Sequence, residues 1–325
     1  MNATDLCGAS SRRILAGLAM MLANLAAAQD YPVRAVSIVV PYGPGSYTDN
    51  VIRPIAVALQ KELGQPVVID NRAGANGVIG SQFAARAKAD GYTLLAGSST
   101  TLAANVGLYK SLPYDPLKDF VPVAGVAATS MMFMVRADFA AQDLKGFLAH
   151  AAKQTQPLAV AYGSASAQVA LAQLAKVSGL KFSSIPYKGT PQALTDLLGG
   201  QVPAAIVDVS NGVPHLKSGK LLALAISGSR RTSAAPEVPT LAEVFPGTQL
   251  VTWIGLVAPT GTSPQVVDKL SQAAAKVLAA PETLRQLAAL ATDPEPMSAQ
   301  EMGRRMQRDQ AQWLELMREA GIQPE

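Results

Sequence analysis

Three short segments of this sequence combine glycine with serine or threonine and could bind a small anion. They span residues 42–49 (YGPGSYTD), 97–101 (GSSTT) and 162–168 (YGSASAQ), and each stands where a strand-like run gives way to a helix-like one. The first turn of a helix leaves backbone N–H groups without partners, and the helix dipole places about half a positive charge there. Together with the hydroxyl groups, these amides favour a carboxylate or a phosphate. Each segment alone is also explained by helix capping, which is worth ~1 kcal/mol.

Two charged side chains follow other strand-like runs. Asp208 ends the run AAIVD, where its carboxylate could accept hydrogen bonds from a ligand hydroxyl or amine, or could cap the following turn. Lys188, in PYKGT, could meet the far end of an anionic ligand or simply lie exposed. The sequence leaves both alternatives open.

The motifs of several enzyme classes are absent. Thr48 occupies the position of the third glycine in a dinucleotide fingerprint, and no Gly-Lys-Ser/Thr or Gly-x-Ser-x-Gly motif occurs. The two histidines, His150 and His215, fall in separate segments without an acidic cluster at metal-ligand spacing. We therefore expect no metal and no cofactor, although composition alone leaves a Ser/His/Asp triad open.

The N-terminus has the pattern of a secretory signal peptide, which we place at residues 1–28. An Arg-Arg pair (12–13) precedes an apolar run, 14–28, that ends in three alanines. This run is shorter than the ~20 apolar residues of a membrane-spanning helix. Cleavage near Ala28 would remove Cys7, the only cysteine, and leave an exported periplasmic protein without thiols. A buried N-terminal helix is the alternative, and the arginine pair leaves Sec and twin-arginine export open.

Composition and charge restrict the class of protein. The chain has 325 residues, of which 49% are hydrophobic and 15% charged, which suits two globular domains and argues against disorder. The formal net charge is +4, but the basic residues are dispersed rather than gathered with aromatic ones, so we expect no nucleic-acid partner. A mild positive balance suits an anionic small ligand without identifying it.

Strands and helices that alternate along the chain must position the three segments. Such alternation is typical of β-α-β units with parallel strands, in which ligands lie beyond the carboxyl ends of the strands. Pro54 lies inside the first helix and should kink it or mark a later start. The expected strands are 35–40, 66–70, 92–98, 131–135, 158–164, 183–189, 204–209 and 221–227. The expected helices are 49–63, 78–89, 168–178, 191–199 and one near the C-terminus, with capping boxes at Thr240/Glu243 and Ser298/Glu301.

The region 110–135 breaks the alternation, because it is rich in proline and charge before the apolar run MMFMV. We interpret it as the crossing into a second domain and place the return crossing near 221–227. The predicted domains are 30–128 together with about 228–325, and 129–227. Two α/β domains joined by two crossings form a cleft that a hinge can close on a small molecule.

The sequence resembles the Bug family, the periplasmic substrate-binding proteins of tripartite tricarboxylate transporters. The opening YPVRAVSIVVPYGPGSYTD fits the family's strand, glycine-containing loop and aspartate. Further blocks fit in the same order: GQPVVIDNRAGANGVIGSQFAARAKADGYTLLAGSST, LYKSLPYDPLKDFVPVA, PYKGTPQALTDLLGGQV, PHLKSGKLLALAISGSRR and PEVPTLAEVFPG. The resemblance covers essentially all of residues 31–325.

The resemblance implies a type II periplasmic-binding-protein fold, with two α/β domains, a central cleft and two crossover connections. It also implies that amides and hydroxyls of two facing loops hold one ligand carboxylate, here 45–49 and 164–166, with 98–100 nearby. Together with the residues singled out above, the expected ligand-binding set is Tyr42, Gly45, Ser46, Tyr47, Thr48, Asp49, Ser98, Ser99, Thr100, Ser164, Ala165, Ser166, Lys188 and Asp208.

This sequence departs from the family pattern near the predicted site. Gly45 is followed by Ser46 where a second glycine is common, Val169 replaces a frequent histidine, and Pro203 replaces a common aspartate. The second-domain loop is also shorter than the common form. The resemblance therefore does not identify the ligand beyond its anchored carboxylate.

The function that these features favour is capture of a small organic carboxylate in the periplasm and its delivery to the membrane subunits of a tripartite tricarboxylate transporter. We expect a monomer that is not an enzyme. One alternative is a secreted enzyme acting on a carboxylate, with Asp208 or Asp49 as the general base. The other is a component that presents its ligand to a sensor kinase.

Overall fold

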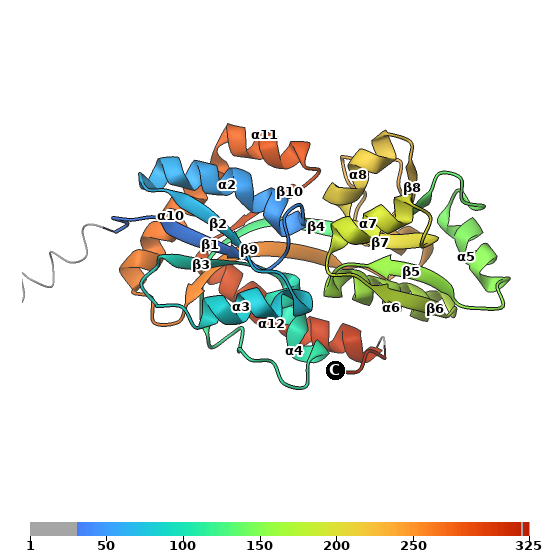
Figure 1. Ribbon diagram of the computed structural model, residues 1–325, viewed down its shortest axis with the longest axis horizontal. Helices are drawn as coiled ribbons and strands as arrows, with labels where there is room; N and C mark the ends of the chain where they lie inside the picture. Colours follow the sequence, from blue (N-terminus) through green and yellow to red (C-terminus); the bar gives the residue numbers. More distant parts are fainter. Residues whose placement is uncertain (1–30, 320, 325) are drawn as a thin grey trace, which may run out of the picture.

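The computed structural model describes residues 31–319 and 321–324. The signal peptide predicted at residues 1–28, with Cys7, lies outside the described residues. The described chain forms two α/β lobes that lie side by side along the long axis of the molecule (Figure 1). Within the part of the chain that the structure describes, no helix combines the length and the apolar character needed to cross a bilayer.

The first lobe is built on three parallel strands. β1 (Val36–Val40) lies between β2 (Val67–Asn71) and β3 (Thr93–Ser98). The apolar residues of β1 and β3 are buried because helices cover both faces of this sheet. One face carries α2 (Tyr47–Leu63), α10 (Pro264–Ala279) and α11 (Pro281–Ala289), and the other carries α3 (Val78–Ala85) and α12 (Ala299–Glu319) (Figure 1).

The second lobe repeats this arrangement on a smaller scale. β5 (Leu158–Tyr162) lies between β6 (Phe182–Pro186) and β7 (Ala204–Asp208), and these three strands are again parallel. The helices of this lobe are α5 (Leu144–Ala152), α6 (Ala165–Ser178), α7 (Thr190–Leu198) and α8 (Val209–Lys217).

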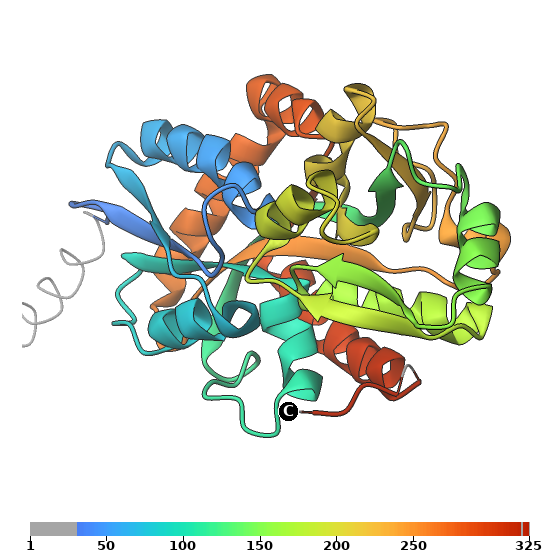
Figure 2. The ribbon, with the colours of Figure 1, turned by 45° about the vertical axis from the view of Figure 1, so that its right-hand side comes forward.

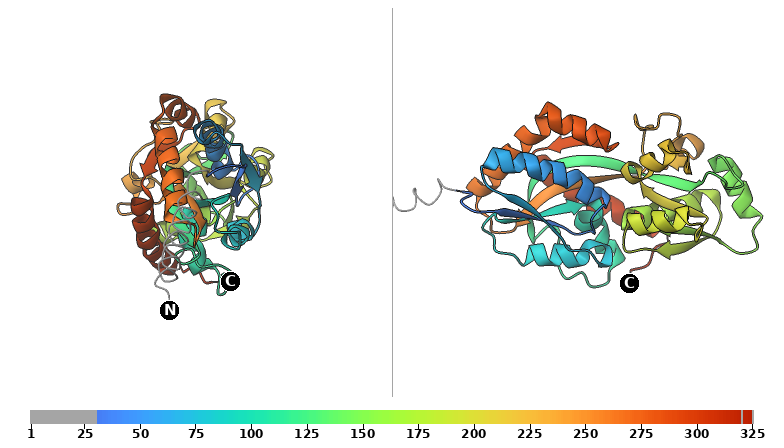
Figure 3. Two further views of the ribbon diagram at one scale, coloured as in Figure 1. Left: turned by 90° about the vertical axis from the view of Figure 1, so that its left-hand side faces the viewer. Right: turned by 45° about the horizontal axis from the view of Figure 1, so that its top comes forward.

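Two long strands connect the lobes. β4 (Phe120–Arg136) pairs with β9 (Val251–Pro259) as far as Ser130, and from Met131 onward with β7 and β8 (Leu221–Ile226). β9 also pairs with β3, so the chain returns to the first lobe through it. Figure 2 shows β9 as the orange strand across the middle of the molecule, and the right-hand panel of Figure 3 shows the same passage from another side.

The first crossing differs in detail from the prediction. The predicted strand 131–135 is only the second half of β4, which begins inside the proline-rich region. Pro122 fits there because the register between β4 and β9 shifts just after it, and prolines are tolerated at such bulges. Among the named strands β8 pairs only with β4, and the chain then reaches β9 in the first lobe through residues 227–250, so the position of the return crossing stays a prediction. The residue bounds of the two domains stay a prediction.

The helix that follows the first segment also begins elsewhere than predicted. α2 starts at Tyr47, two residues early, with Ser46 as its N-cap, and Gly64 ends it with a φ of 67°. Pro54 lies within α2, so the later start that this proline suggested is wrong. α3 ends at Ala85 rather than at 89.

Two local predictions concern capping boxes, and both are confirmed. Thr240 Oγ1 accepts a hydrogen bond from the backbone amide of Glu243. In return, the Glu243 carboxylate accepts one from the backbone amide of Thr240. Ser298 and Glu301 make the same reciprocal pair before α12. The shorter elements are η1 (Ala75–Gly77), η2 (Thr100–Ala104), α4 (Asn105–Leu108), α9 (Leu241–Val244) and β10 (Asp293–Met297).

Candidate functional site

A small cavity of about 40 Å³ lies where strand ends of the two lobes meet. The loop after β1, the end of β3, the loop after β5 and the end of β7 all contribute to its wall, as expected for ligand sites at the carboxyl ends of parallel strands. Its lining residues are Tyr42, Ser46, Tyr47, Thr48, Ser98, Ser99, Thr100, Gly163, Ser164, Ser166, Gly189, Thr190, Asp208, Thr252 and Trp253.

Most of the residues predicted to bind a ligand line this cavity. Those brought together are Tyr42, Ser46, Tyr47, Thr48, Ser98, Ser99, Thr100, Ser164, Ser166 and Asp208. The others do not line it: Gly45, Asp49, Ala165 and Lys188. Lys188 is exposed beyond β6, which corresponds to the second of the two alternatives that the sequence left open.

The aspartate of the first segment holds its own loop rather than facing the cavity. Asp49 Oδ2 accepts from the Gly45 amide at 2.9 Å, so that amide, predicted to be free for a ligand, is already occupied. Arg53 Nη2 and Asn71 Nδ2 donate to Asp49 Oδ1 at 2.8 and 2.9 Å. Burial alone would raise the pKa of Asp49, but hydrogen bonds from Arg53, Asn71 and the Gly45 amide hold the pKa below its usual value.

The start of α2 still presents free donors. Ser46 Oγ accepts from the Asp49 amide at 3.3 Å, which caps the helix. The amides of Tyr47 and Thr48, in the same turn, meet no acceptor among the described residues. Because both residues line the cavity, the positive end of α2 is directed at it.

The start of α6 faces the same cavity from the second lobe. Ser164 Oγ accepts from the Ala167 amide at 3.3 Å, while the Ser166 amide meets no acceptor in the described part of the chain. Gly163 packs so closely that a Cβ atom there would lie 2.3 Å from the carbonyl carbon of Gly189. Only glycine therefore lets the loop after β5 reach the start of α7.

Two hydrogen bonds join the lobes around the cavity, which places this structure in a closed arrangement. Thr100 Oγ1 and Ser166 Oγ share a hydrogen bond of 3.2 Å. Asn211 Nδ2, from α8, donates to the Gly45 carbonyl at 3.1 Å. Ser99 Oγ, buried in the same wall, has no hydrogen-bond partner among the described residues. An unpaired buried hydroxyl is unfavourable, so a ligand atom could satisfy it.

Asp208 is the ionisable carboxyl group of the cavity wall. Only 8% of it is exposed, and Thr190 Oγ1 donates to its Oδ2 at 3.0 Å. It is the N-cap residue of α8, but its side chain makes no capping hydrogen bond, so the capping role considered from the sequence is not observed. Burial raises the pKa of Asp208 to about 6, and the Thr190 hydroxyl opposes this rise.

Aromatic side chains complete the wall. The Tyr42 hydroxyl shares a hydrogen bond of 2.8 Å with Ser98 Oγ, and burial raises the pKa of Tyr42 above its usual range. Burial also raises the pKa of Tyr47, with the negative charge of Asp208 adding to the effect. Trp253 donates its Nε1–H to Asp309 Oδ2 at 2.7 Å, which fixes the indole from behind.

Sequence reasoning missed five lining residues for two reasons. Thr252 and Trp253 belong to β9, which was not predicted, although the apolar run VTWIGLVAP that ends at Pro259 could have indicated a strand. Gly163, Gly189 and Thr190 lie in loops that were recognised, and the sequence GTP before α7 is a helix-start signal. Their contact with the cavity depends on how the loops pack.

Comparison with known proteins identifies the family. A family model described as the tripartite tricarboxylate transporter family receptor matches residues 51–322. The chain belongs to this family. The match confirms the resemblance found in the sequence, and the family consists of substrate-binding proteins.

Solved structures agree with this receptor over almost its whole described length. The periplasmic binding protein BugD is 32% identical with a TM-score of 0.87, and the alignment covers 91% of this chain and 100% of BugD. Rpa4515 of R. palustris, solved with adipate, is 30% identical with a TM-score of 0.88 over 91% and 100% of the two chains. MatC of Rhodopseudomonas palustris, with bound malate, is 34% identical with a TM-score of 0.83 over 88% and 99%. These neighbours confirm the predicted two-domain periplasmic-binding-protein fold.

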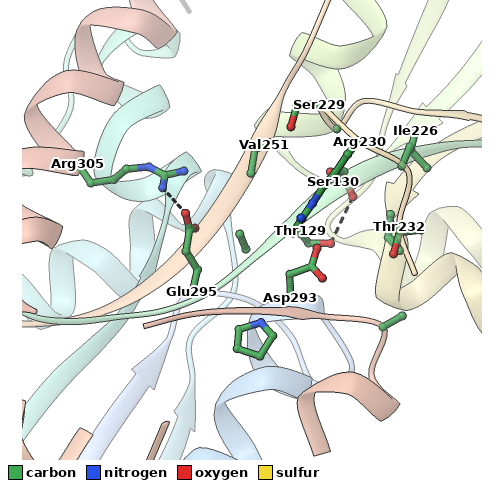
Figure 4. A pocket seen from close by; sticks show the side chains of 15 residues that line it. Thr129, Ser130, Ile226, Ser229, Arg230, Thr232, Val251, Asp293, Glu295 and Arg305 are labelled. Atoms are coloured by element: carbon green, nitrogen blue, oxygen red, sulfur yellow. Dashed lines mark hydrogen bonds and ion pairs between the residues drawn. The ribbon is translucent and has the colours of Figure 1, made fainter. Parts of the chain in front are cut away.

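The receptor also has a larger cavity of about 500 Å³ beside the crossing strands (Figure 4). Its walls come from β4, β9, β10 and the loop after β8, and Figure 4 shows Arg230, Asp293, Glu295 and Arg305 around it. Arg305 Nη1 lies 2.8 Å from Glu295 Oε1, so these two charges neutralise each other. None of the predicted site residues lines this cavity, and we take the smaller one as the candidate site.

Proposed function

We propose that this receptor captures a small organic carboxylate in the cavity between its lobes and delivers it to the membrane subunits of a tripartite tricarboxylate transporter. One observation carries the proposal: Tyr47 and Thr48 of α2 and Ser166 of α6, whose amides meet no acceptor among the described residues, line the same cavity from opposite lobes. A carboxylate placed there would accept from both helix starts and would gain from both dipoles. The adipate and malate bound to relatives of this receptor are carboxylates as well.

Capture requires the lobes to move. We propose the lobes as residues 30–128 with about 228–325, and 129–227, joined by β4 and β9. Opening would break the Thr100–Ser166 and Asn211–Gly45 hydrogen bonds and expose the cavity to solvent. A ligand that bridges both helix starts would favour the closed arrangement, because it binds that arrangement better than the open one.

The remaining parts of the proposal concern location and chemistry. We propose that residues 1–28 are a signal peptide cleaved near Ala28 and that the mature protein is a periplasmic monomer. We also propose that it is not an enzyme. Asp49, one of two candidate general bases, is held by Arg53 and Asn71, and Asp208 is the one acidic group among the described residues that line the cavity. No histidine, lysine or second carboxyl group among the described lining residues stands beside Asp208 as an acid–base partner.

Thermal unfolding with a panel of carboxylates tests this function. The purified protein, unfolded and refolded to remove any co-purified ligand, is mixed with mono-, di- and tricarboxylates and with amino acids. A compound present at 100 times its dissociation constant should stabilise the fold by ~2.7 kcal/mol, which raises the melting temperature measurably. If no carboxylate of any kind raises it, the proposed function is wrong.

A further inference from the structure

The charge on the cavity wall is unusual for a site that binds an anion. Asp208 is its ionisable carboxyl, and no lysine, arginine or histidine is among the described residues that line it. Lys188, which from the sequence could meet the far end of the ligand or lie exposed, is exposed and does not line the cavity. A second carboxylate on the ligand would therefore find no positive side chain and would approach a buried negative one. Such a pair of like charges is strongly unfavourable unless one of them is protonated.

The surroundings of Asp208 suit a cation instead. Its Oδ2 accepts from Thr190, whereas Oδ1 receives no hydrogen bond from another side chain in the described part of the chain. Tyr42, Tyr47 and Trp253 line the same cavity, and aromatic faces attract ammonium groups. A buried carboxylate without a cationic partner is costly, and an ammonium group of the ligand would supply that partner.

The two ends of the cavity therefore differ in the charge that they favour, and they lie close together. The amides of Tyr47, Thr48 and Ser166 favour a negative group, and Asp208 with the aromatic side chains favours a positive one. The cavity is small, about 40 Å³ in this closed arrangement, which favours a compact ligand whose two charged groups are near each other.

We propose that the ligand is a small amino carboxylic acid, with its carboxylate on the helix-start amides of α2 and α6 and its ammonium group donating to Asp208. This inference rests on the proposed function, which requires only that the ligand has a carboxylate. It adds that the ligand also carries a positively charged amino group. It places Asp208 as the residue that selects amino acids over acids without an amino group.

The pH dependence of the affinity distinguishes an amino acid ligand from a dicarboxylate. Burial raises the pKa of Asp208 to about 6, so its carboxylate ionises as the pH rises from 5 to 7.5. An ammonium ligand should bind more tightly over that range. A dicarboxylate that shares a proton with Asp208 should bind more weakly over the same range. The other titratable groups that line the cavity, Tyr42 and Tyr47, have raised pKa values and stay neutral throughout.

Matched pairs of ligands test the proposal by calorimetry. The refolded protein is titrated with alanine against propionate, aspartate against succinate, and the remaining common amino acids and β-alanine against their deaminated counterparts. We expect one or more amino members to bind at least tenfold more tightly than their partners at pH 7.5, with affinity falling at pH 5. Asp208→Asn should reduce that preference to less than threefold.

The possible outcomes separate this proposal from the function on which it rests. If only carboxylates without an amino group bind, or if they bind as tightly as their amino partners, the proposal is overturned and the carboxylate function stands. If none of these compounds binds, the proposal is overturned, and the wider thermal-unfolding panel of mono-, di- and tricarboxylates decides the carboxylate function separately. A preference for the amino member that Asp208→Asn leaves unchanged would also overturn the role given to Asp208. Thermal unfolding of the variant shows whether it is folded.

Discussion

At the scale of the residue, Asp208 destabilises the receptor in the absence of ligand. A carboxyl group whose pKa is higher in the folded than in the unfolded state contributes stability below the unfolded value and loses it as the pH rises through the folded one. The pKa of Asp208 is about 6, against ~3.9 for an exposed aspartate, and two pKa units correspond to about 3 kcal/mol. The empty receptor at neutral pH therefore carries a penalty that a cationic partner would remove.

The first prediction follows from that penalty. Asp208→Asn should raise the free energy of unfolding of the ligand-free protein by about 2–3 kcal/mol at pH 7.5, because the buried charge is removed while Thr190 can still donate to the amide oxygen. The gain should vanish at pH 4, where Asp208 is protonated. Urea unfolding at both pH values measures it. An equal gain at the two pH values would contradict the assigned cause.

Asp49→Asn is the matched control, because the surroundings of Asp49 lower its pKa, whereas those of Asp208 raise it. Arg53, Asn71 and the Gly45 amide hold the pKa of Asp49 below its usual value, so its contribution to stability is present at pH 7.5 and is lost as the pH falls through its folded pKa. The variant should be less stable than the wild type at pH 7.5. If both substitutions change the free energy of unfolding in the same direction at that pH, it is wrong that burial disfavours the Asp208 carboxylate and that pairing favours the Asp49 carboxylate.

Sequence and structure agree best on single residues whose role is local. The caps at Thr240 and Ser298 depend on a partner three residues away, and the sequence shows that partner directly. The role of Asp49 could not be predicted in the same way. Its partner Asn71 lies 22 residues away on β2, so only the fold decides that Asp49 braces the loop instead of facing the ligand.

At the scale of the element, the β-α-β rhythm predicted most of the fold because each strand–helix pair has its own local signals. β9 is the exception, since it follows a long loop, and α10 behind it was not predicted either although Ser263 and Pro264 are a helix-start signal. The omission of β9 removed Trp253 and Thr252 from the predicted site. Pairing with both β3 and β4, rather than any local pattern, makes this segment a central strand.

The helix behind β9 gives a second prediction. Asp309, on α12, accepts from Trp253 Nε1 at 2.7 Å and from Arg305 Nε at 2.6 Å, and it is only 5% exposed. Asp309→Ala should lower the free energy of unfolding by about 1–3 kcal/mol, because the indole N–H and Arg305 Nε lose their acceptor while Glu295 still pairs with Arg305 Nη1. Urea unfolding measures the loss.

An exposed pair on the same helix is the control for this prediction. Glu315 and Arg318 form an ion pair one turn apart, and both side chains are at least half exposed. Glu315→Ala should leave the free energy of unfolding almost unchanged, since solvent screens such pairs. Comparable losses in the two variants would show that the burial of Asp309 is not what matters.

At the scale of the whole molecule, the fold brings helix starts from two lobes to one cavity. Each lobe contributes hydroxyl-rich loops at its own strand ends, which the sequence predicts, but their distance from one another depends on how β4 and β9 set the two sheets. The Thr100–Ser166 and Asn211–Gly45 hydrogen bonds join residues 66 and 166 positions apart, and no sequence pattern predicts them. Capture of a ligand is therefore a property of both lobes together.

Loss of a single amide tests that capture most directly. Thr48→Pro removes one donor at the second position of α2, where proline is tolerated because that N–H has no partner within the helix. Lys145→Pro makes the same change at the second position of α5, whose start lies outside the cavity lining. Calorimetry with the carboxylate that binds the wild type best should show at least a tenfold weaker affinity for Thr48→Pro and an unchanged affinity for Lys145→Pro. Wild-type affinity in both variants would contradict the claim that helix-start amides hold the ligand.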